Sequence, residues 1–83
     1  MEQTRILGIL VETKSEAALR VQDVLTKYGC SVRTRLGIHL PDKPGCKKCG
    51  LILLELFGNE DECLRLENEL YALEGVSVEK MDF

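Results

Sequence analysis

The chain repeats one order of structural signals twice, 46 positions apart. Branched aliphatic runs begin at positions 5 and 51, as "RILGILVE" and "LILLELF", and such runs are typical of buried strands. Each run is followed by a helix-capping pattern and by apolar residues at helical spacing. A glycine then predicts the end of the helix, because glycine readily adopts the left-handed backbone conformation found there. The matched positions are Thr13 and Asn59, Glu16 and Glu62, and Gly29 and Gly75.

Two further strands complete the halves. "CSVRTRLGIHL" (30–40) alternates in polarity, and "VSVEKMDF" (76–83) closes the second half. The order is therefore βαββαβ, the split βαβ unit. Right-handed crossovers place both helices on one face of a four-stranded antiparallel sheet. The sequence thus predicts an α+β, ferredoxin-like fold, and 83 residues suffice for a single domain over 1–83.

Composition and motifs narrow the class of function. The net charge is -3 and the basic residues form no stripe of the kind that binds nucleic acid directly. The N-terminus "MEQTRILGILVE" resembles neither a signal peptide nor a membrane span, so a cytoplasmic protein with no membrane partner is expected. The chain has 1 histidine, no Ser/His/Asp set and no phosphate-cradling loop, which predicts that it is not an enzyme.

The second and third strands are expected to form a hairpin in which Leu40 faces Gly50. In that register Arg35 lies opposite Glu55, a favourable cross-strand pair, on the face that the helices leave open. The other parity would then face the helices and form the core. Those predicted core residues are Val32, Thr34, Leu36 and Ile38 with Ile52, Leu54 and Leu56.

The uncovered face of this sheet is predicted to be apolar. Leu51, Leu53 and Phe57 fall on it, and the first strand is apolar at both parities, whereas an open face is usually polar. Such a patch exceeds what a soluble monomer normally exposes. It predicts a homodimer or homotetramer joined through the sheet, or else a different protein packed on it. The predicted interface residues are Leu51, Leu53, Phe57, Arg35 and Glu55.

The loop "PDKPGCKKCG" contains Cys46 and Cys49 in the Cys-x-x-Cys-Gly form of a metal knuckle. If it binds a metal, His39 and Asp42 are the nearest further ligands, and zinc or another transition metal is the expected cofactor. A strand follows the motif where a thioredoxin-type dithiol would need a helix. A reversible disulfide and free loop thiols remain as alternatives, and the sequence favours free thiols.

Cys30 and Cys63 are expected at the opposite end of the sheet from this loop, because strands rise about 3.3 Å per residue. A four-cysteine site within one chain is therefore excluded by the predicted fold. Cys30 shares parity with Val32, and Cys63 lies on the apolar stripe of the second helix. Both are interpreted as small buried hydrophobic residues.

The phrases "ILVE", "VQDVLTKYG", "TRLGIH", "LILLEL" and "EGVSVEKMDF" resemble one known family over nearly the whole chain. They are similar to the small ACT-like proteins grouped as iron-only hydrogenase system regulators, which share a fold with the C-terminal sensor domain of the nickel-responsive repressor. The resemblance implies an ACT-like, oligomeric domain that senses a small molecule or metal ion. The repressor's nickel site uses several histidines, whereas His39 is alone here, and the Cys46–Cys49 insert departs from the family pattern.

The sequence therefore predicts a non-enzymatic regulatory or sensor module that acts as a homo-oligomer and binds a small molecule or metal ion. One alternative is a metal-binding protein that uses the Cys46-x-x-Cys49 loop. Another is an interaction subunit that packs its open sheet face on a different protein.

Overall fold

The computed structural model describes residues 4–12, 16–39 and 49–83, with the backbone alone for His39 and Cys49. Four strands and two α-helices follow one another in the predicted βαββαβ order. They are β1 (Arg5–Glu12), α1 (Ala17–Lys27), a 3-10 turn η1 (Gly29–Ser31), β2 (Val32–His39), β3 (Cys49–Leu56), α2 (Glu60–Tyr71) and β4 (Val76–Asp82).

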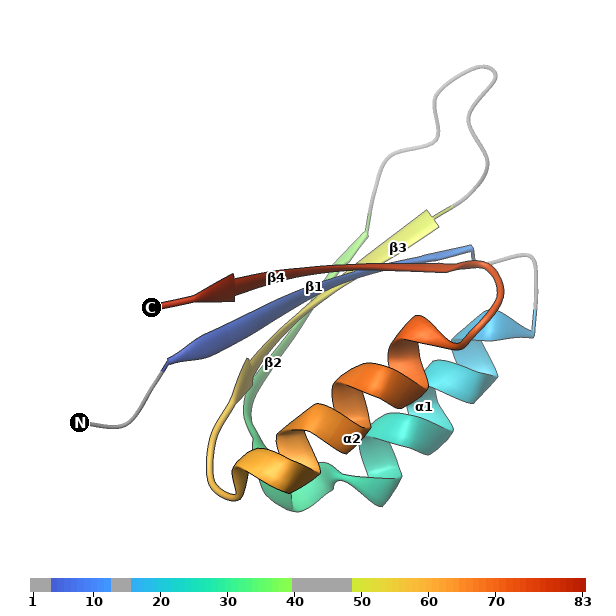
Figure 1. The fold of residues 1–83 in the computed structure, drawn as a ribbon. Coiled ribbons are helices and arrows are strands. Elements are labelled where there is room, and N and C mark those ends of the chain that lie inside the picture. The colour runs from blue at the N-terminus through green and yellow to red at the C-terminus, as the bar shows by residue number, and fades with distance from the viewer. Residues whose placement is uncertain (1–3, 13–15, 40–48) are drawn as a thin grey trace.

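The strands form one antiparallel sheet in the order β2-β3-β1-β4. Both helices lie on the same face of this sheet, and the other face has no helix over it (Figure 1). This arrangement confirms the α+β, ferredoxin-like and ACT-like fold. The central strands β1 and β3 each pair on both sides, and β2 and β4 are the edge strands.

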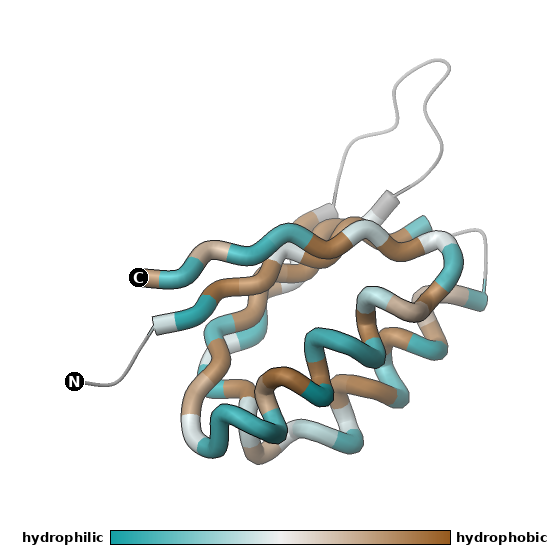
Figure 2. The backbone as a smooth tube through the Cα atoms, in the orientation of Figure 1, coloured by the Kyte–Doolittle hydropathy of each residue, from teal (hydrophilic) through white to brown (hydrophobic). Residues whose placement is uncertain are grey.

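The core lies between the sheet and the helices. Alternate residues of β1 are buried, and they pack with apolar side chains of β3, α1 and α2; Figure 2 shows hydrophobic residues along both layers. Burying one aliphatic side chain of this kind stabilises the fold by about 1.5–3 kcal/mol relative to leaving it exposed. The largest fully buried apolar side chains are Leu7, Ile9, Leu54, Leu66, Leu70 and Val21.

The start of α2 forms as predicted, whereas α1 differs. The Asn59 side chain accepts a hydrogen bond of 3.1 Å from the backbone N–H of Glu62, which confirms the N-cap. Helix α1 begins at Ala17 after Glu16, which makes no side-chain capping bond, and Thr13 lies outside the described residues.

The two glycine stops also differ. Gly75 has φ 75°, which confirms the left-handed conformation, although it lies in the turn before β4 rather than directly after α2. The prediction for Gly29 is wrong, because that residue sits in the 3-10 turn η1 and is not among the glycines with positive φ. The chain leaves α1 through a tighter turn of helix, which needs no left-handed residue.

The predicted hairpin register is wrong by one residue. His39 lies opposite Gly50, and Arg35 pairs with Leu54 instead of Glu55. Because side chains alternate along a strand, this slip puts Arg35 and Glu55 on different faces of the sheet. A β-bulge between Val32 and Thr34 accompanies the shift, since two β2 residues there span one β3 residue. The predicted Arg35–Glu55 pair therefore does not exist.

The register also corrects the predicted core. Leu36 pairs with Leu53 and Ile38 with Leu51, so these residues face away from the helices, as does Thr34. The predicted burial of Leu54 and Leu56 under the helices is confirmed, and Val32 and Ile52 are partly buried against the same core.

The two described cysteine side chains differ from each other. Cys63 is buried on the inner stripe of α2, as predicted, but Cys30 is exposed. The reason is that Cys30 belongs to η1, and β2 begins only at Val32. Strand parity therefore does not apply to Cys30.

Candidate functional site: the open face of the sheet

The sheet face turned away from the helices is named the open face. It contains Ile6, Gly8 and Leu10 of β1, Leu51, Leu53 and Glu55 of β3, Thr34, Leu36 and Ile38 of β2, and Ser77, Glu79 and Met81 of β4. Apolar residues therefore run across all four strands. Leu36 is 53% exposed and Met81 is 54% exposed, which leaves much of this apolar surface in contact with solvent.

The predicted interface residues fall in three places. Leu51, Leu53 and Glu55 lie on the open face, and all three are half-buried. Phe57 lies just beyond the end of β3 and is partly exposed at the rim. Arg35 lies on the helix side of the edge strand β2 and does not belong to the open face.

Sequence reasoning missed Leu36 and Ile38 as members of the open face. The sequence predicts both in the core, because a register with Leu40 opposite Gly50 puts their parity on the helix-covered side. The strand β2 is an edge strand whose helix-side positions include Arg35 and Gly37. The apolar side of a strand is usually its buried side. That rule does not identify the buried side here, because both faces of the hairpin carry apolar residues.

A small polar group borders the apolar residues at one end of the open face. Thr34 Oγ1 donates a hydrogen bond of 3.0 Å to Glu55 Oε1, and Arg33 Nη1 lies 3.8 Å from Glu55 Oε2. The Arg33 guanidinium carbon is 4.9 Å from the centroid of the Phe57 ring, within cation–π range. Glu55 thus pairs with the residues at the bulge, instead of with Arg35.

Gly8 lies at the centre of the open face, where β1 passes between Leu53 of β3 and Glu79 of β4. A Cβ atom at this position would meet Leu53 Cδ2 at 3.7 Å and the Glu79 carbonyl oxygen at 4.0 Å, which are ordinary contacts. The folded chain would therefore accept a side chain at position 8. Its absence leaves the backbone open to close approach from outside the chain.

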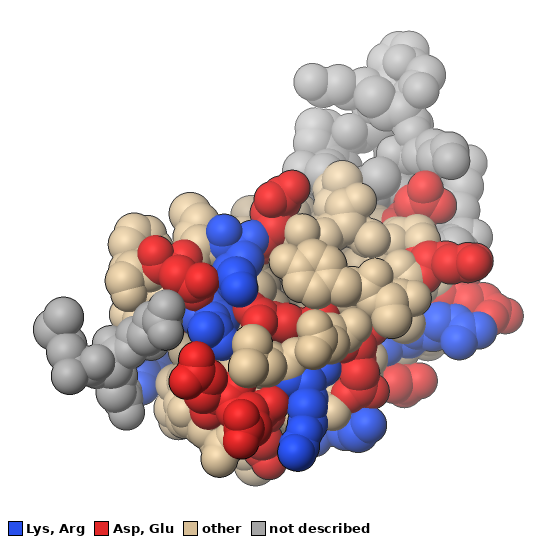
Figure 3. Space-filling model, in the orientation of Figure 1, with Lys and Arg blue, Asp and Glu red and all other residues tan. Residues whose placement is uncertain are grey.

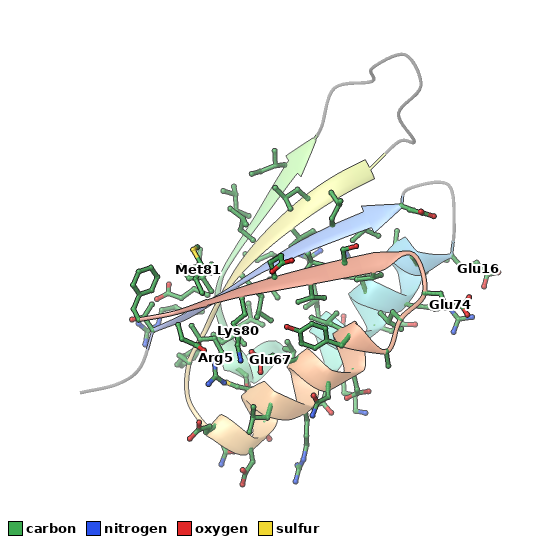
Figure 4. All side chains as sticks on the ribbon, turned by 45° about the horizontal axis from the view of Figure 1, so that its top comes forward. Arg5, Glu16, Glu67, Glu74, Lys80 and Met81 are labelled. Carbon is green, nitrogen blue, oxygen red and sulfur yellow. The ribbon has the colours of Figure 1, made fainter. Side chains whose placement is uncertain are left out.

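A second cluster of functional groups lies on the opposite, helix-covered side. Arg5 of β1, Glu67 of α2 and Lys80 of β4 lie together there, while Met81 points to the other side of β4 (Figure 4). Glu67 is only 3% exposed, and its Oε1 atom is 3.7 Å from both Arg5 Nε and Lys80 Nζ. At this distance the contacts are ion pairs rather than hydrogen bonds. Within the described part of the chain, Glu67 Oε1 has no hydrogen-bond partner.

Asp82 completes this cluster. Arg5 Nε donates a hydrogen bond of 2.9 Å to Asp82 Oδ1. That bond holds the pKa of the Asp82 carboxyl below its usual value and raises the pKa of Arg5. The cluster joins β1, β4 and α2 through ion pairs between opposite charges, so we call it a structural lock. On the outer surface of this side, Figure 3 shows acidic and basic side chains intermixed.

Cys63 is not a reactive group in this arrangement. Its thiol lies 3.6 Å from the Phe57 carbonyl oxygen, and burial raises the pKa of the thiol. A thiol kept protonated is a poor nucleophile and a poor metal ligand.

The predicted metal site falls largely outside the described residues. Cys46 and Asp42 lie there, and only the backbone of His39 and Cys49 is placed, opposite Gly50 and Glu12 respectively. Within residues 4–12, 16–39 and 49–83, no three His, Cys, Asp or Glu residues gather in a metal-binding group. Metal binding by the loop therefore stays a prediction.

No family model and no curated protein matches the chain. Solved structures do. The uncharacterized protein TM1266 from Thermotoga maritima is 24% identical, with a TM-score of 0.82 over 100% of this chain and 99% of that chain. The ACT domain from the GTP pyrophosphokinase of Chlorobium tepidum is 19% identical, with a TM-score of 0.68 over 98% of this chain and 100% of that chain.

The apo form of CPII from Thiomonas intermedia K12, a nitrogen regulatory PII-like protein, is also similar. It is 14% identical, with a TM-score of 0.69 over 98% of this chain and 89% of that chain. At these identities the likeness establishes a shared fold, the ferredoxin-like fold of ACT domains and PII-like proteins. Among the described residues, no helix has the length and apolar character needed to cross a membrane.

Proposed function

We propose that the chain is a non-enzymatic regulatory module that works as a homo-oligomer assembled through the open face and binds a small molecule or ion. The observation that carries this proposal is the apolar surface across all four strands, with Leu36 and Met81 about half exposed. A soluble chain rarely leaves such a face uncovered. A second copy presents the same apolar surface and so is a suitable partner.

The size of the sheet fits this role. Four strands spaced by about 4.8 Å, each about 26 Å long, give a footprint on the order of 500 Å² per copy. Two such faces bury on the order of 1,000 Å², which is near the lower limit for a specific protein interface. The open face is therefore large enough for a homodimer, and a tetramer would need further surface.

The fold supports a regulatory role by analogy. One similar structure is an ACT domain of a GTP pyrophosphokinase, and another is a nitrogen regulatory PII-like protein that was also solved with ADP, AMP and bicarbonate. The resemblance of short phrases in the sequence to iron-only hydrogenase system regulators supports the same class of function. None of these ligands is assigned to the present chain.

Sedimentation equilibrium of the purified chain tests the proposal. The wild type is expected to be a dimer or tetramer at micromolar concentration. Leu53→Glu should raise the dissociation constant about a hundredfold or more, because each copy would bury an unpaired charge. The control is Leu19→Glu, since Leu19 is 70% exposed on α1. A monomeric wild type would contradict self-association and favour a different protein as the occupant of the open face.

A metal-binding function is the second candidate, favoured by Cys46 and Cys49 in the knuckle-like sequence. Its ligand would be zinc or another transition metal, with His39 and Asp42 as further ligands. Elemental analysis of anaerobically purified protein tests it. The double variant Cys46→Ser, Cys49→Ser should lose the metal but keep the fold and the oligomer mass, because the described core does not include this loop.

A further inference from the structure

The helix-covered side of the sheet contains a half-open cavity of about 160 Å³. It lies between α1 and the central strands, on the opposite side from the open face. Its five lining residues are Val11, Ala18, Gln22, Gly50 and Ile52. Val11 of β1 and Gly50 of β3 are direct partners in the sheet, and Ile52 is the next helix-facing residue of β3.

The cavity exists because small residues meet where larger ones would fill the core. In the helix-facing rows of the sheet, β3 contributes Gly50 and β2 contributes Gly37, opposite Ile52. The first turn of α1 adds the small side chain of Ala18, and the next turn adds Gln22. A Cβ atom built at Gly37 would meet nothing within 4 Å. In the neighbouring row the larger side chains of Leu54 and Leu7 are fully buried.

The lining decides which chemistry could enter. Four of the five residues offer only apolar side chains or bare backbone, and the fifth, Gln22, lies at an exposed helix position and offers one amide. None of the five is charged, so an ionic ligand would lose its hydration without gaining a partner. An apolar cavity of about 150 Å³ is large enough for a molecule the size of benzene.

We infer that this cavity binds a small uncharged amphiphile of about six heavy atoms, with a compact branched or cyclic apolar group and one hydrogen-bonding group held at Gln22. The inference rests on the proposed function for its biological role, since occupancy of the cavity would be the state that the module senses. The site is separate from the open face, so that binding and self-association can be measured independently.

A titration of the full chain followed by ¹H–¹⁵N NMR tests the inference, with isobutyramide as the probe. Saturable shifts in the millimolar range are expected for the amides of the lining residues. Acetamide, which lacks the branched chain, should bind about tenfold more weakly. Isobutyrate, which has the same chain and a charge, should also bind at least about tenfold more weakly. Shifts confined to the open face, or equal affinity for acetamide, would overturn the inference.

Two variants keep the test decisive. Ala18→Leu fills the cavity and should weaken isobutyramide binding at least about tenfold. The matched control is Ala72→Leu at the exposed end of α2, which should bind like the wild type. Gln22→Ala, at an exposed helix position that tolerates alanine, should weaken isobutyramide but leave benzene binding unchanged. Wild-type affinity in both Ala18→Leu and Gln22→Ala would overturn the inference, even if sedimentation shows the proposed oligomer.

Discussion

Each face of the sheet contains side chains that are unusual for its position. The helix-covered face encloses Arg5 and Glu67, whereas the open face leaves Leu36 and Met81 in solvent. A folded monomer normally places its charges outside and its apolar side chains inside. The inner charges are explained within the chain, because Glu67 lies 3.7 Å from both Arg5 and Lys80, and the same two cations also pair with Asp82.

Nothing in the described chain plays the same part for the open face. Its apolar residues meet one another across the strands, as Leu36 meets Leu53 and Ile38 meets Leu51, but no second layer covers them. The comparison indicates that residues exposed in a single copy can be buried in the functional oligomer. It supports the proposal that a second copy supplies the missing layer.

The largest effect is expected from breaking the charged side of this comparison. Glu67→Ala removes the anion that Arg5 and Lys80 share in a site that is 3% exposed. We expect the free energy of unfolding to fall by about 3 kcal/mol, because the remaining cations lose a buried partner. Urea denaturation measures this change.

The matched control is Glu74→Ala, which removes a glutamate from an exposed position after α2. Its effect should stay within about 0.5 kcal/mol. If Glu67→Ala costs no more than this control, the inner cluster is not a structural lock. The buried charges on the helix-covered side would then not contribute to folding stability.

The order of elements could be predicted from the sequence because its signals are local. Aliphatic runs, helical stripes and the Asn59 cap each depend on a few neighbouring residues. The register of β2, in contrast, depends on a single bulged residue. The alternation of side chains along β2 therefore predicted the wrong face for Leu36 and Ile38. Apolar alternation decides a strand's inner face only when its outer face is polar.

The inner cluster was harder to predict for a different reason. Glu67 follows Cys63 by four residues and precedes Leu70 by three, so its place on the inner stripe of α2 could have been noticed. Its partners Arg5 and Lys80 come from the two ends of the chain. They meet only because β1 and β4 are neighbours in the sheet, which is a property of the topology.

A second experiment sharpens the apolar side of the comparison at Gly8. Gly8→Val should leave the fold intact or stabilise it slightly, because a Cβ there makes only ordinary contacts and valine favours strands. The same side chain would project from the centre of the open face and hold two sheets apart. We therefore expect the dissociation constant of the oligomer to rise about tenfold, as measured by sedimentation.

Gly8→Val thus separates folding from assembly. Thermal or urea denaturation of the variant serves as its control, since a misfolded chain would lose stability together with self-association. Unchanged association by a well-folded variant would mean that Gly8 is not at the contact. The oligomer would then have to form through another part of the open face or through the sheet edges.

The smallest expected effect is a pH dependence of folding stability that arises from Asp82 of β4. The pKa of Asp82 is lowered chiefly by its hydrogen bond from Arg5, so the ionised carboxyl stabilises the folded chain above the ordinary aspartate pKa of about 4. That contribution is lost as the pH falls through the lower pKa of the folded state. Asp82→Asn should therefore be less stable than the wild type at about pH 7, and the difference should shrink towards about pH 2.

Urea denaturation at several pH values measures this difference in stability. The control is Asn68→Gln, an exposed substitution on α2 that removes no ionisable group and should show no such trend. A wild-type advantage over Asp82→Asn that stays constant with pH would contradict an ionic origin for the lock.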